Sequence, residues 1–392
     1  MKIINLDHIS ANPILPEVKE AMKEAIDADY GNPSSQHKLG DVAAEALDKS
    51  RESVAKLVHA DIAREVVFTS CGTESVNHAI KGVAFALEEK GKHIVTSNIE
   101  HNAVIRSIRR LKSLGYRVTS VPVDEYGRVN PKNVAEAITD ETILVSIMHS
   151  NNETGTIQPI EEIGKITKEK RVLFHVDAVD SVGVVPIDVN ALGVDLLSFA
   201  SNPFYGPTGV GGLYVRRGTR VNPLLDGGIQ ENNKRAGTEN LIGIVGMGVA
   251  AELALRDMDA RIAHFRRLKE KLLRELPEYI DEYLINTHPE HSLPNLVSVS
   301  VKYIEGESVM LMLDDDDIEV STRSACATGS LRASHVLVSI GRSHADAQGT
   351  LVISFGIENT EEDVTAFLTA LRNTVTTLRN MSPLYKKKAS QA

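Results

Sequence analysis

Residues 198–217, SFASNPFYGPTGVGGLYVRR, contain two strand-like apolar runs joined by a tight loop. The stretch holds four glycines and two prolines between its polar ends. A loop of this composition usually surrounds a small ligand or a close backbone contact. Its most loop-like dipeptide, Asn202-Pro203, has no side chain able to do covalent chemistry. The stretch therefore predicts a ligand-binding loop whose central residues carry no reactive side chain.

Strand-like and helical patterns alternate along the chain that leads to this loop. Short β-rich runs separated by amphipathic helices predict βα units and a mostly parallel sheet. We therefore expect an α/β fold with ligands at the carboxyl ends of the strands. The expected strands are 65–70, 93–97, 116–123, 142–148, 172–177, 195–199 and 211–215, and the expected helices are 73–90, one from 102, 131–138 and 160–169.

The pattern changes after about residue 240 and predicts a smaller α+β domain. A long helix at 241–275 precedes a strand at 296–301, and Thr360 is placed to cap the last helix. We assign residues 14–250 to a large α/β domain, and residues 1–13 and 251–385 to the small domain. Residues 386–392 are expected to form a disordered tail.

Composition narrows the classes of function. The chain has 392 residues and a formal net charge of −10, which argues against nucleic-acid binding. Its two cysteines, Cys71 and Cys326, are too few for a disulfide framework and indicate a reducing compartment. No apolar run reaches the length of a membrane span, and the first residues lack a signal-peptide pattern. We expect a cytoplasmic protein without a membrane partner.

Several polar clusters directly follow predicted strands. Gly72 and Thr73 open a helix and could bind a phosphate, although a plain helix cap is an equal alternative. His101 and Asn152 stand at strand ends, where a structural histidine and a turn-forming asparagine are the simpler interpretations. Asp177 ends a very apolar strand, so its carboxylate needs a buried cationic partner.

Cys326 lies in a run of small residues, STRSACATGSLRASH. This setting suits a reactive thiol, and an inert buried cysteine is the competing interpretation. Glycine spacing in GPTGVGG does not match a dinucleotide loop, and the motifs of phosphate loops and metal sites are absent from the sequence. No metal is expected.

Together these segments resemble the cysteine desulfurases of the NifS/IscS type, which are class V aminotransferase-like enzymes with the aspartate-aminotransferase fold. The resemblance covers nearly the whole chain and implies a homodimer that uses pyridoxal 5′-phosphate (PLP). The matching segments are YGNPSSQH (30–37), FTSCGTES (68–75), EHNAV (100–104), NNETGTIQPI (151–160), HVDA (175–178), RAGTEN (235–240), IEGES (304–308), SAC (324–326) and ENTEEDV (358–364).

The resemblance implies roles for individual residues. His101 matches the histidine that stacks on the pyridine ring and shuttles protons, and Cys326 matches the nucleophile that becomes a persulfide. Asp177 matches the aspartate that pairs with the pyridinium nitrogen, which would supply its expected cation. The other cofactor-binding matches are Gly72 and Thr73 at the phosphate, Asn152 near the ring, and Thr238 at the phosphate of the neighbouring subunit.

Departures from the family pattern concentrate at the reactive positions. Where the family has its Schiff-base lysine, this chain has Pro203. Asn202 and Ala200 stand where the family has a phosphate-binding histidine and a serine. Ser201 is the hydroxyl expected to bind the cofactor in this segment. A glutamine is replaced by Asp180 in the cofactor site. The substrate-binding arginines have become Val352 and Ile357, and DNAATTP has become DHISANP (7–13).

These losses impair separate steps, because the lysine is both covalent anchor and base and the arginine clamps the substrate carboxylate. We therefore expect a sulfur-transfer protein that carries sulfur as a persulfide on Cys326 and hands it to an iron–sulfur assembly or thiolation partner. Its PLP would be non-covalent or absent, and its sulfur would come from L-cysteine or another donor. One alternative is a non-catalytic dimeric scaffold. Others are an atypical desulfurase that relies on His101, and PLP chemistry on another substrate.

Overall fold

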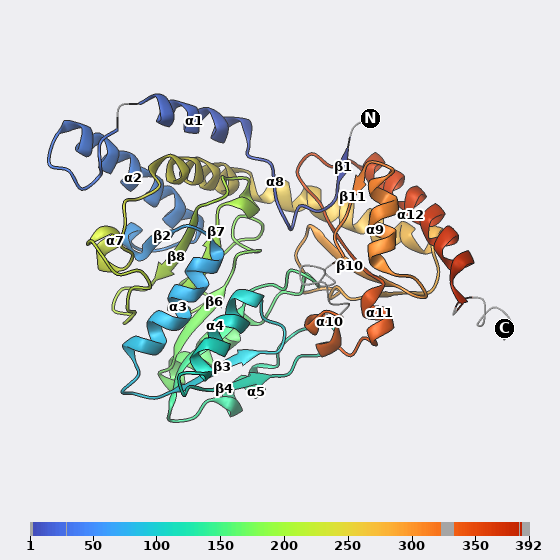
Figure 1. Cartoon of the computed structure of the whole chain (residues 1–392), viewed down its shortest axis with the longest axis horizontal. Coiled ribbons are helices and arrows are strands. Elements are labelled where there is room, and N and C mark those ends of the chain that lie inside the picture. Colours follow the sequence, from blue (N-terminus) through green and yellow to red (C-terminus); the bar gives the residue numbers. More distant parts are fainter. Residues whose placement is uncertain (1–2, 29, 323–332, 384, 386–392) are drawn as a thin grey trace.

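The computed structural model describes residues 3–28, 30–322, 333–383 and 385. A seven-stranded sheet, in the order β2-β8-β7-β6-β5-β3-β4, forms the centre of the larger part (Figure 1). Only β8 runs antiparallel to its neighbours, which confirms the expected mostly parallel α/β sheet. The strands are β2 (Val66–Thr69), β3 (His93–Ser97), β4 (Arg117–Val121), β5 (Thr142–Met148), β6 (Leu173–Asp177), β7 (Leu196–Ala200) and β8 (Gly211–Val215).

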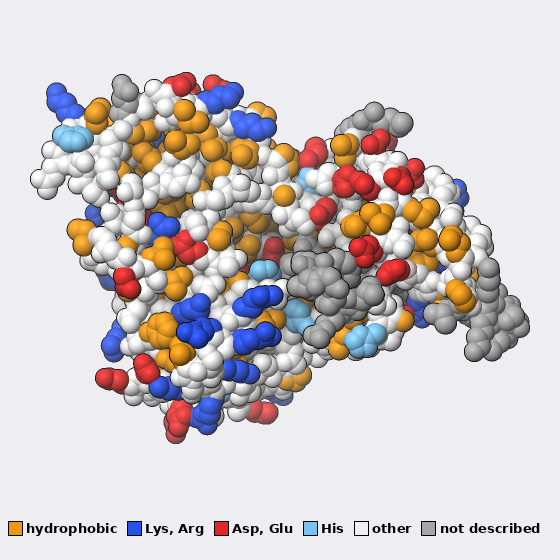
Figure 2. Space-filling view, in the orientation of Figure 1, with side chains coloured by type: hydrophobic (Ala, Val, Ile, Leu, Met, Phe, Trp, Pro, Cys, Tyr) orange, Lys and Arg blue, Asp and Glu red, His pale blue; other side chains and the backbone are white. Residues whose placement is uncertain are grey.

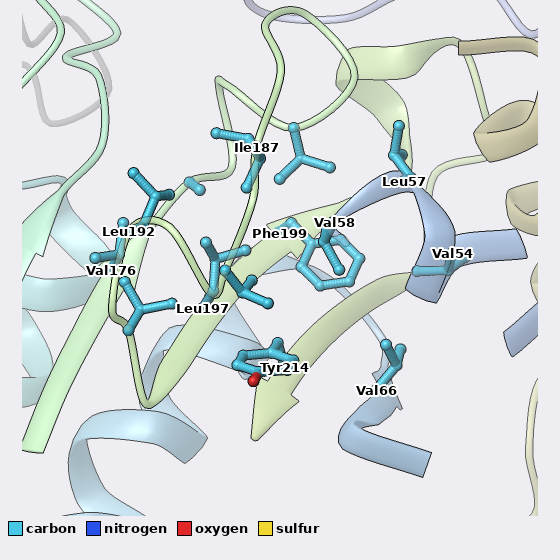
Figure 3. Packing of buried hydrophobic residues seen from close by; sticks show 14 of the residues in the cluster. Val54, Leu57, Val58, Val66, Val176, Ile187, Leu192, Leu197, Phe199 and Tyr214 are labelled. Carbon is cyan, nitrogen blue, oxygen red and sulfur yellow. The ribbon is translucent and has the colours of Figure 1, made fainter. Parts of the chain in front are cut away.

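Helices cover both faces of this sheet (Figure 1). On one face, α3 and α4 pack on a cluster that includes Ile80, Val104 and Leu144. On the other face lies the largest apolar core, in which Val58, Phe199 and Tyr214 meet (Figure 3). The helices of this part are α1 (Pro16–Asp27), α2 (Lys38–Leu57), η1 (Ala63–Glu65), α3 (Gly72–Ala86), α4 (Asn102–Lys112), α5 (Pro131–Ala137), α6 (Ile160–Lys170), η2 (Asn202–Phe204) and α7 (Gln230–Asn233).

The smaller part is built on a three-stranded antiparallel sheet in the order β12-β10-β9. The amino-terminal strand β1 joins this part by pairing with β11, far along the chain. Thr360 caps the last helix through a reciprocal capping box with Asp363. Its elements are β1 (Ile4–Asn5), β9 (Tyr283–Ile285), β10 (Leu296–Val301), α9 (Gly306–Asp314), β11 (Ile318–Glu319), α10 (His335–Ser339), α11 (His344–Gln348), β12 (Thr350–Ser354) and α12 (Glu361–Met381).

Helix α8 (Leu241–Tyr279) runs through both parts of the molecule (Figure 1). Met247 in its first half belongs to the core of the large sheet, whereas Leu268 and Leu272 belong to the core of the small part. The expected domain division at residue 250 therefore lies inside one continuous helix. Among the described residues, no helix combines the length and apolarity needed to cross a membrane.

Candidate active site

The polar segments singled out by sequence meet at one edge of the large sheet. Strands β2, β3, β5, β6 and β7 point in one direction, so their carboxyl ends share an edge. Asp177 is the last residue of β6, and the segments that follow the other four strands carry Gly72, His101, Asn152 and Pro203. Topology thus brings together residues that lie far apart in the sequence.

Asp177 is the most deeply buried acid of the expected site. It ends β6, is 5% exposed, and its Oδ1 accepts a hydrogen bond of 3.2 Å from the Val179 N–H. Burial raises the pKa of Asp177 to about 6. A carboxyl group in this position favours a cation beside it.

Glu100 is a second buried acid, which the sequence analysis passed over. It is 1% exposed, and its Oε1 accepts hydrogen bonds from Ser97 Oγ (2.5 Å) and Met148 N (3.2 Å). Burial raises the pKa of Glu100 to about 8, and the charge of Asp177 adds to that rise. The available signal was an acidic residue directly before His101, three residues after the end of the buried strand β3.

His101 and Asn152 are placed by the turns in which they stand. His101 is the N-cap of α4, and its Nδ1 accepts the Ala103 N–H at 3.2 Å. Of the asparagine pair, Asn151 is the turn former: its Oδ1 accepts the Thr154 N–H, and its Nδ2 donates to Ile99 O. Asn152 is half-buried and contributes none of these turn contacts.

The N-terminus of α3 has the features of an anion site. Its N-cap, Cys71, makes no capping hydrogen bond with its side chain, so the first N–H groups of the helix are not capped in this way. Gly72 is required sterically, because an added Cβ would lie 2.5 Å from Val179 Cγ2. Thr73 is exposed beside it.

The loop at the expected lysine position is held by the amino-terminal segment. Asn12 Nδ2 donates to the carbonyl oxygens of Asn202 (3.3 Å) and Pro203 (3.4 Å), and Asn202 Nδ2 donates back to Asn12 O (3.4 Å). His8 Nδ1 lies 2.9 Å from Asn12 Oδ1 and completes this contact. Ser201 is fully buried, with its Oγ against Gly206. Two departures from the family pattern therefore touch each other.

Of the two positions, 352 and 357, at which a carboxylate-binding arginine was expected, position 352 is apolar. Val352, in β12, is fully buried in a cluster with Val184, Leu293 and Leu296. Ile9, another departure in the amino-terminal segment, packs against the same cluster. Substitutions at residues 9 and 352 thus form one apolar contact where a charged group was expected.

Three further residues were expected in the site, and for these the structure gives only their exposure or no description. Thr238 is exposed and Asp180 is half-buried. Cys326 lies outside the described residues, as does most of its loop.

A mostly parallel sheet with polar residues gathered at the carboxyl ends of its strands is the arrangement expected of class V aminotransferase-like enzymes, and comparison with known proteins gives the same family. The Aminotransferase class-V family model matches residues 4–367. The chain belongs to this family and, within it, to the cysteine desulfurases of the NifS/IscS type.

The relatives match along almost the full chain. It is 47% identical to the cysteine desulfurase IscS of Dictyoglomus turgidum over 384 residues, which covers 98% of this chain and 97% of the relative. It is also 47% identical to the IscS of Methanosarcina thermophila over 386 residues, covering 98% and 95%. A solved NifS-like protein superposes with a TM-score of 0.90 at 38% identity, covering 96% and 100%.

PLP is the cofactor of this family, and the described residues suit its ring nitrogen and its phosphate. Asp177 offers a buried carboxylate for the ring nitrogen, and the α3 N-terminus at Gly72 and Thr73 offers N–H groups for the phosphate. Pro203 offers no amine for a covalent link. The site therefore fits PLP held without a Schiff base to this chain.

Proposed function

We propose that the protein transfers sulfur through a persulfide on Cys326 and that its turnover of L-cysteine is impaired. Membership of the cysteine desulfurases supports the sulfur chemistry. The observation that carries the impairment is the contact of Asn12 with the backbone of Asn202 and Pro203. In this chain the loop at the expected lysine position is tied to the amino-terminal segment.

Four described residues of the site have a part in this proposal. Bound PLP would supply an electron sink for charge that develops at the substrate Cα. Asp177 would keep the ring nitrogen protonated, and Gly72 and Thr73 would hold the phosphate. His101 Nδ1 accepts the Ala103 N–H, so its Nε2 would exchange protons with bound substrate.

Two missing groups limit the reaction. Without a lysine at position 203 the site lacks its usual base, which costs roughly 10²–10⁴ in rate. Without an arginine at position 352 the substrate carboxylate loses a bidentate partner. At residue 352 the position is filled by the packed side chains of the Val184, Leu293 and Leu296 cluster, so water does not replace the lost guanidinium there.

Sulfur can reach Cys326 without PLP chemistry when the donor is a small persulfide. The Cys326 thiolate attacks the terminal sulfur of the donor, the sulfur–sulfur bond of the donor breaks, and the donor thiolate leaves. The protein then holds the persulfide for an acceptor thiolate of a partner, which takes the same sulfur by the same exchange.

The test compares two sulfur donors on the purified full chain with PLP added. Intact-protein mass spectrometry measures bound sulfur after incubation with L-cysteine or with glutathione persulfide, and a sulfide assay follows turnover. We expect one added sulfur from glutathione persulfide and little from L-cysteine. Cys326→Ser should abolish the addition, and Cys71→Ser is the matched control that should retain it.

Other outcomes point to different functions. Rapid sulfide release from L-cysteine that depends on Cys326 would show a working desulfurase and contradict the impairment. No sulfur on Cys326 from either donor would contradict the carrier role and favour the dimeric scaffold.

A further inference from the structure

A cavity of about 210 Å³ lies between α4 and the edge of the large sheet formed by β3 and β4. Thr96 and Glu100 lie at its buried end, whereas Arg109 and Lys112 are exposed at its mouth. Among the described residues, none of the expected lysine loop around Pro203 lines it. No residue expected from the sequence to bind the cofactor lines it.

The buried end of the cavity holds two polar atoms that have no partner among the residues the structure describes. Within that part of the chain, Oγ1 of Thr96 (4% exposed) and Oε2 of Glu100 (1% exposed) make no hydrogen bond. Oε1 of Glu100 is already occupied by Ser97 and Met148. Buried polar groups are normally paired, so two such atoms lining one cavity indicate a missing partner.

The protonation of Glu100 sets the polarity of this end. Burial raises the pKa of Glu100 to about 8, so its carboxyl group is mostly protonated at neutral pH. Because Oε1 accepts two hydrogen bonds, the proton belongs on Oε2. Thr96 and Glu100 then present two O–H donors to the cavity, and the matching group is an oxygen acceptor.

The walls and the mouth of the cavity have a different character. Val104, Ile105 and Ile108 of α4 provide apolar walls. The outer surface of α4 is strongly basic, although the whole chain carries a net charge of −10 (Figure 2). Arg109 and Lys112 belong to this basic surface and also line the cavity, so the mouth favours an anionic group.

We propose that this cavity binds a small organic monoanion of the oxo- or hydroxycarboxylate class. The carboxylate lies at Arg109 and Lys112, a short carbon chain contacts Val104 and Ile108, and the oxo or hydroxyl oxygen accepts hydrogen bonds from Thr96 and Glu100. The inference does not depend on sulfur transfer, since it uses none of the residues of that proposal.

Three probes of similar size separate the contributions. Levulinate carries a carboxylate and a ketone, pentanoate lacks the ketone, and methyl propyl ketone lacks the carboxylate. Binding to the full-length protein is measured by ligand-observed NMR and titration calorimetry. We expect levulinate to bind at least about tenfold more tightly than either comparator, because each lacks one polar anchor.

Variants locate the binding. Thr96→Val keeps the shape but removes the hydroxyl, and Arg109→Gln removes one cation; each should weaken levulinate binding by about tenfold. Arg110→Gln is the matched control, because Arg110 is exposed on the same helix and does not line the cavity. Lys112→Gln is a second mouth variant at an exposed position, where misfolding is not expected.

Two results would overturn the proposal. One is the absence of levulinate binding up to about 10 mM, above the weak affinity expected for so small a ligand. The other is a levulinate affinity that is the same in Thr96→Val, Arg109→Gln and Lys112→Gln as in the control variant Arg110→Gln.

Discussion

Pro203 and Val352 illustrate how single residues change this active site. Each stands where the family resemblance implies a group with a chemical task, an amine in one case and a guanidinium in the other. Neither position is left as an empty gap, because Asn12 binds the backbone at residue 203 and Ile9 packs against the cluster that contains Val352. The departures from the family pattern are therefore paired in space: residue 9 packs against the cluster of residue 352, and residue 12 contacts residue 203.

At the residue scale, we predict that Pro203→Lys alone does not restore turnover of L-cysteine. The new amine can provide a base and a covalent anchor, but the substrate carboxylate still meets Val352 instead of an arginine. The measurement is sulfide release from L-cysteine with saturating PLP, beside the absorbance of a covalently bound cofactor. Pro203→Met, of similar length without an amine, is the control. A Pro203→Lys rate like that of an active desulfurase would refute the importance of the lost clamp.

At the scale of elements, the helices begin where local chemistry places them. Thr360 and Asp363 form the expected capping box at α12, and Asn240 caps α8 through the Gly243 N–H. A capping residue and the N–H group that it binds lie within four residues of each other, so these helix starts can be predicted from the sequence alone. Strand ends follow less closely from local signals, since β4 covers Arg117–Val121 where the sequence predicts a strand at 116–123.

For this cap we predict that Thr360→Ala lowers the free energy of unfolding by about 1 kcal/mol. The Thr360 hydroxyl accepts the Asp363 N–H at 3.2 Å, and the substitution leaves that donor without its cap. Thr365→Ala is the matched control, because Thr365 lies inside the same helix and its hydroxyl donates to Glu361 O instead of capping the helix. Urea denaturation compares the two; equal losses would show that the cap contributes nothing specific.

At the scale of the whole molecule, the buried acids tie stability to pH. The folded state raises the pKa of Glu100 from its ordinary value of 4.5 to about 8, so the folded protein binds this proton more tightly than the unfolded chain. The stabilisation is complete below the unfolded pKa and is lost as the pH rises through the folded pKa. Asp177 acts in the same direction over a lower range.

We therefore predict that the free energy of unfolding falls between pH 4.5 and about 8, with a slope of at most about 1.4 kcal/mol per pH unit from Glu100. Glu100→Gln, which is neutral at every pH, should flatten this dependence. Denaturant unfolding across that range provides the measurement. Glu125→Gln, at an exposed position, should leave the slope unchanged. If both variants keep the wild-type slope, Glu100 is not the titrating group.

Local periodicity and contiguous motifs predict the order of βα units, the mostly parallel sheet and the family, because each of these signals lies within a short stretch of chain. The same reasoning identifies Asp177 as an acid in need of a cation. By contrast, the folded chain is needed to show that Asn12 contacts the backbone of Asn202, 190 positions away in the loop of Pro203, and that Ile9 packs against the apolar cluster of Val352. It also revealed Glu100 and Thr96 as unsatisfied groups in a cavity. Contacts of this kind depend on how the strands are ordered in space, and no local pattern in the chain specifies them.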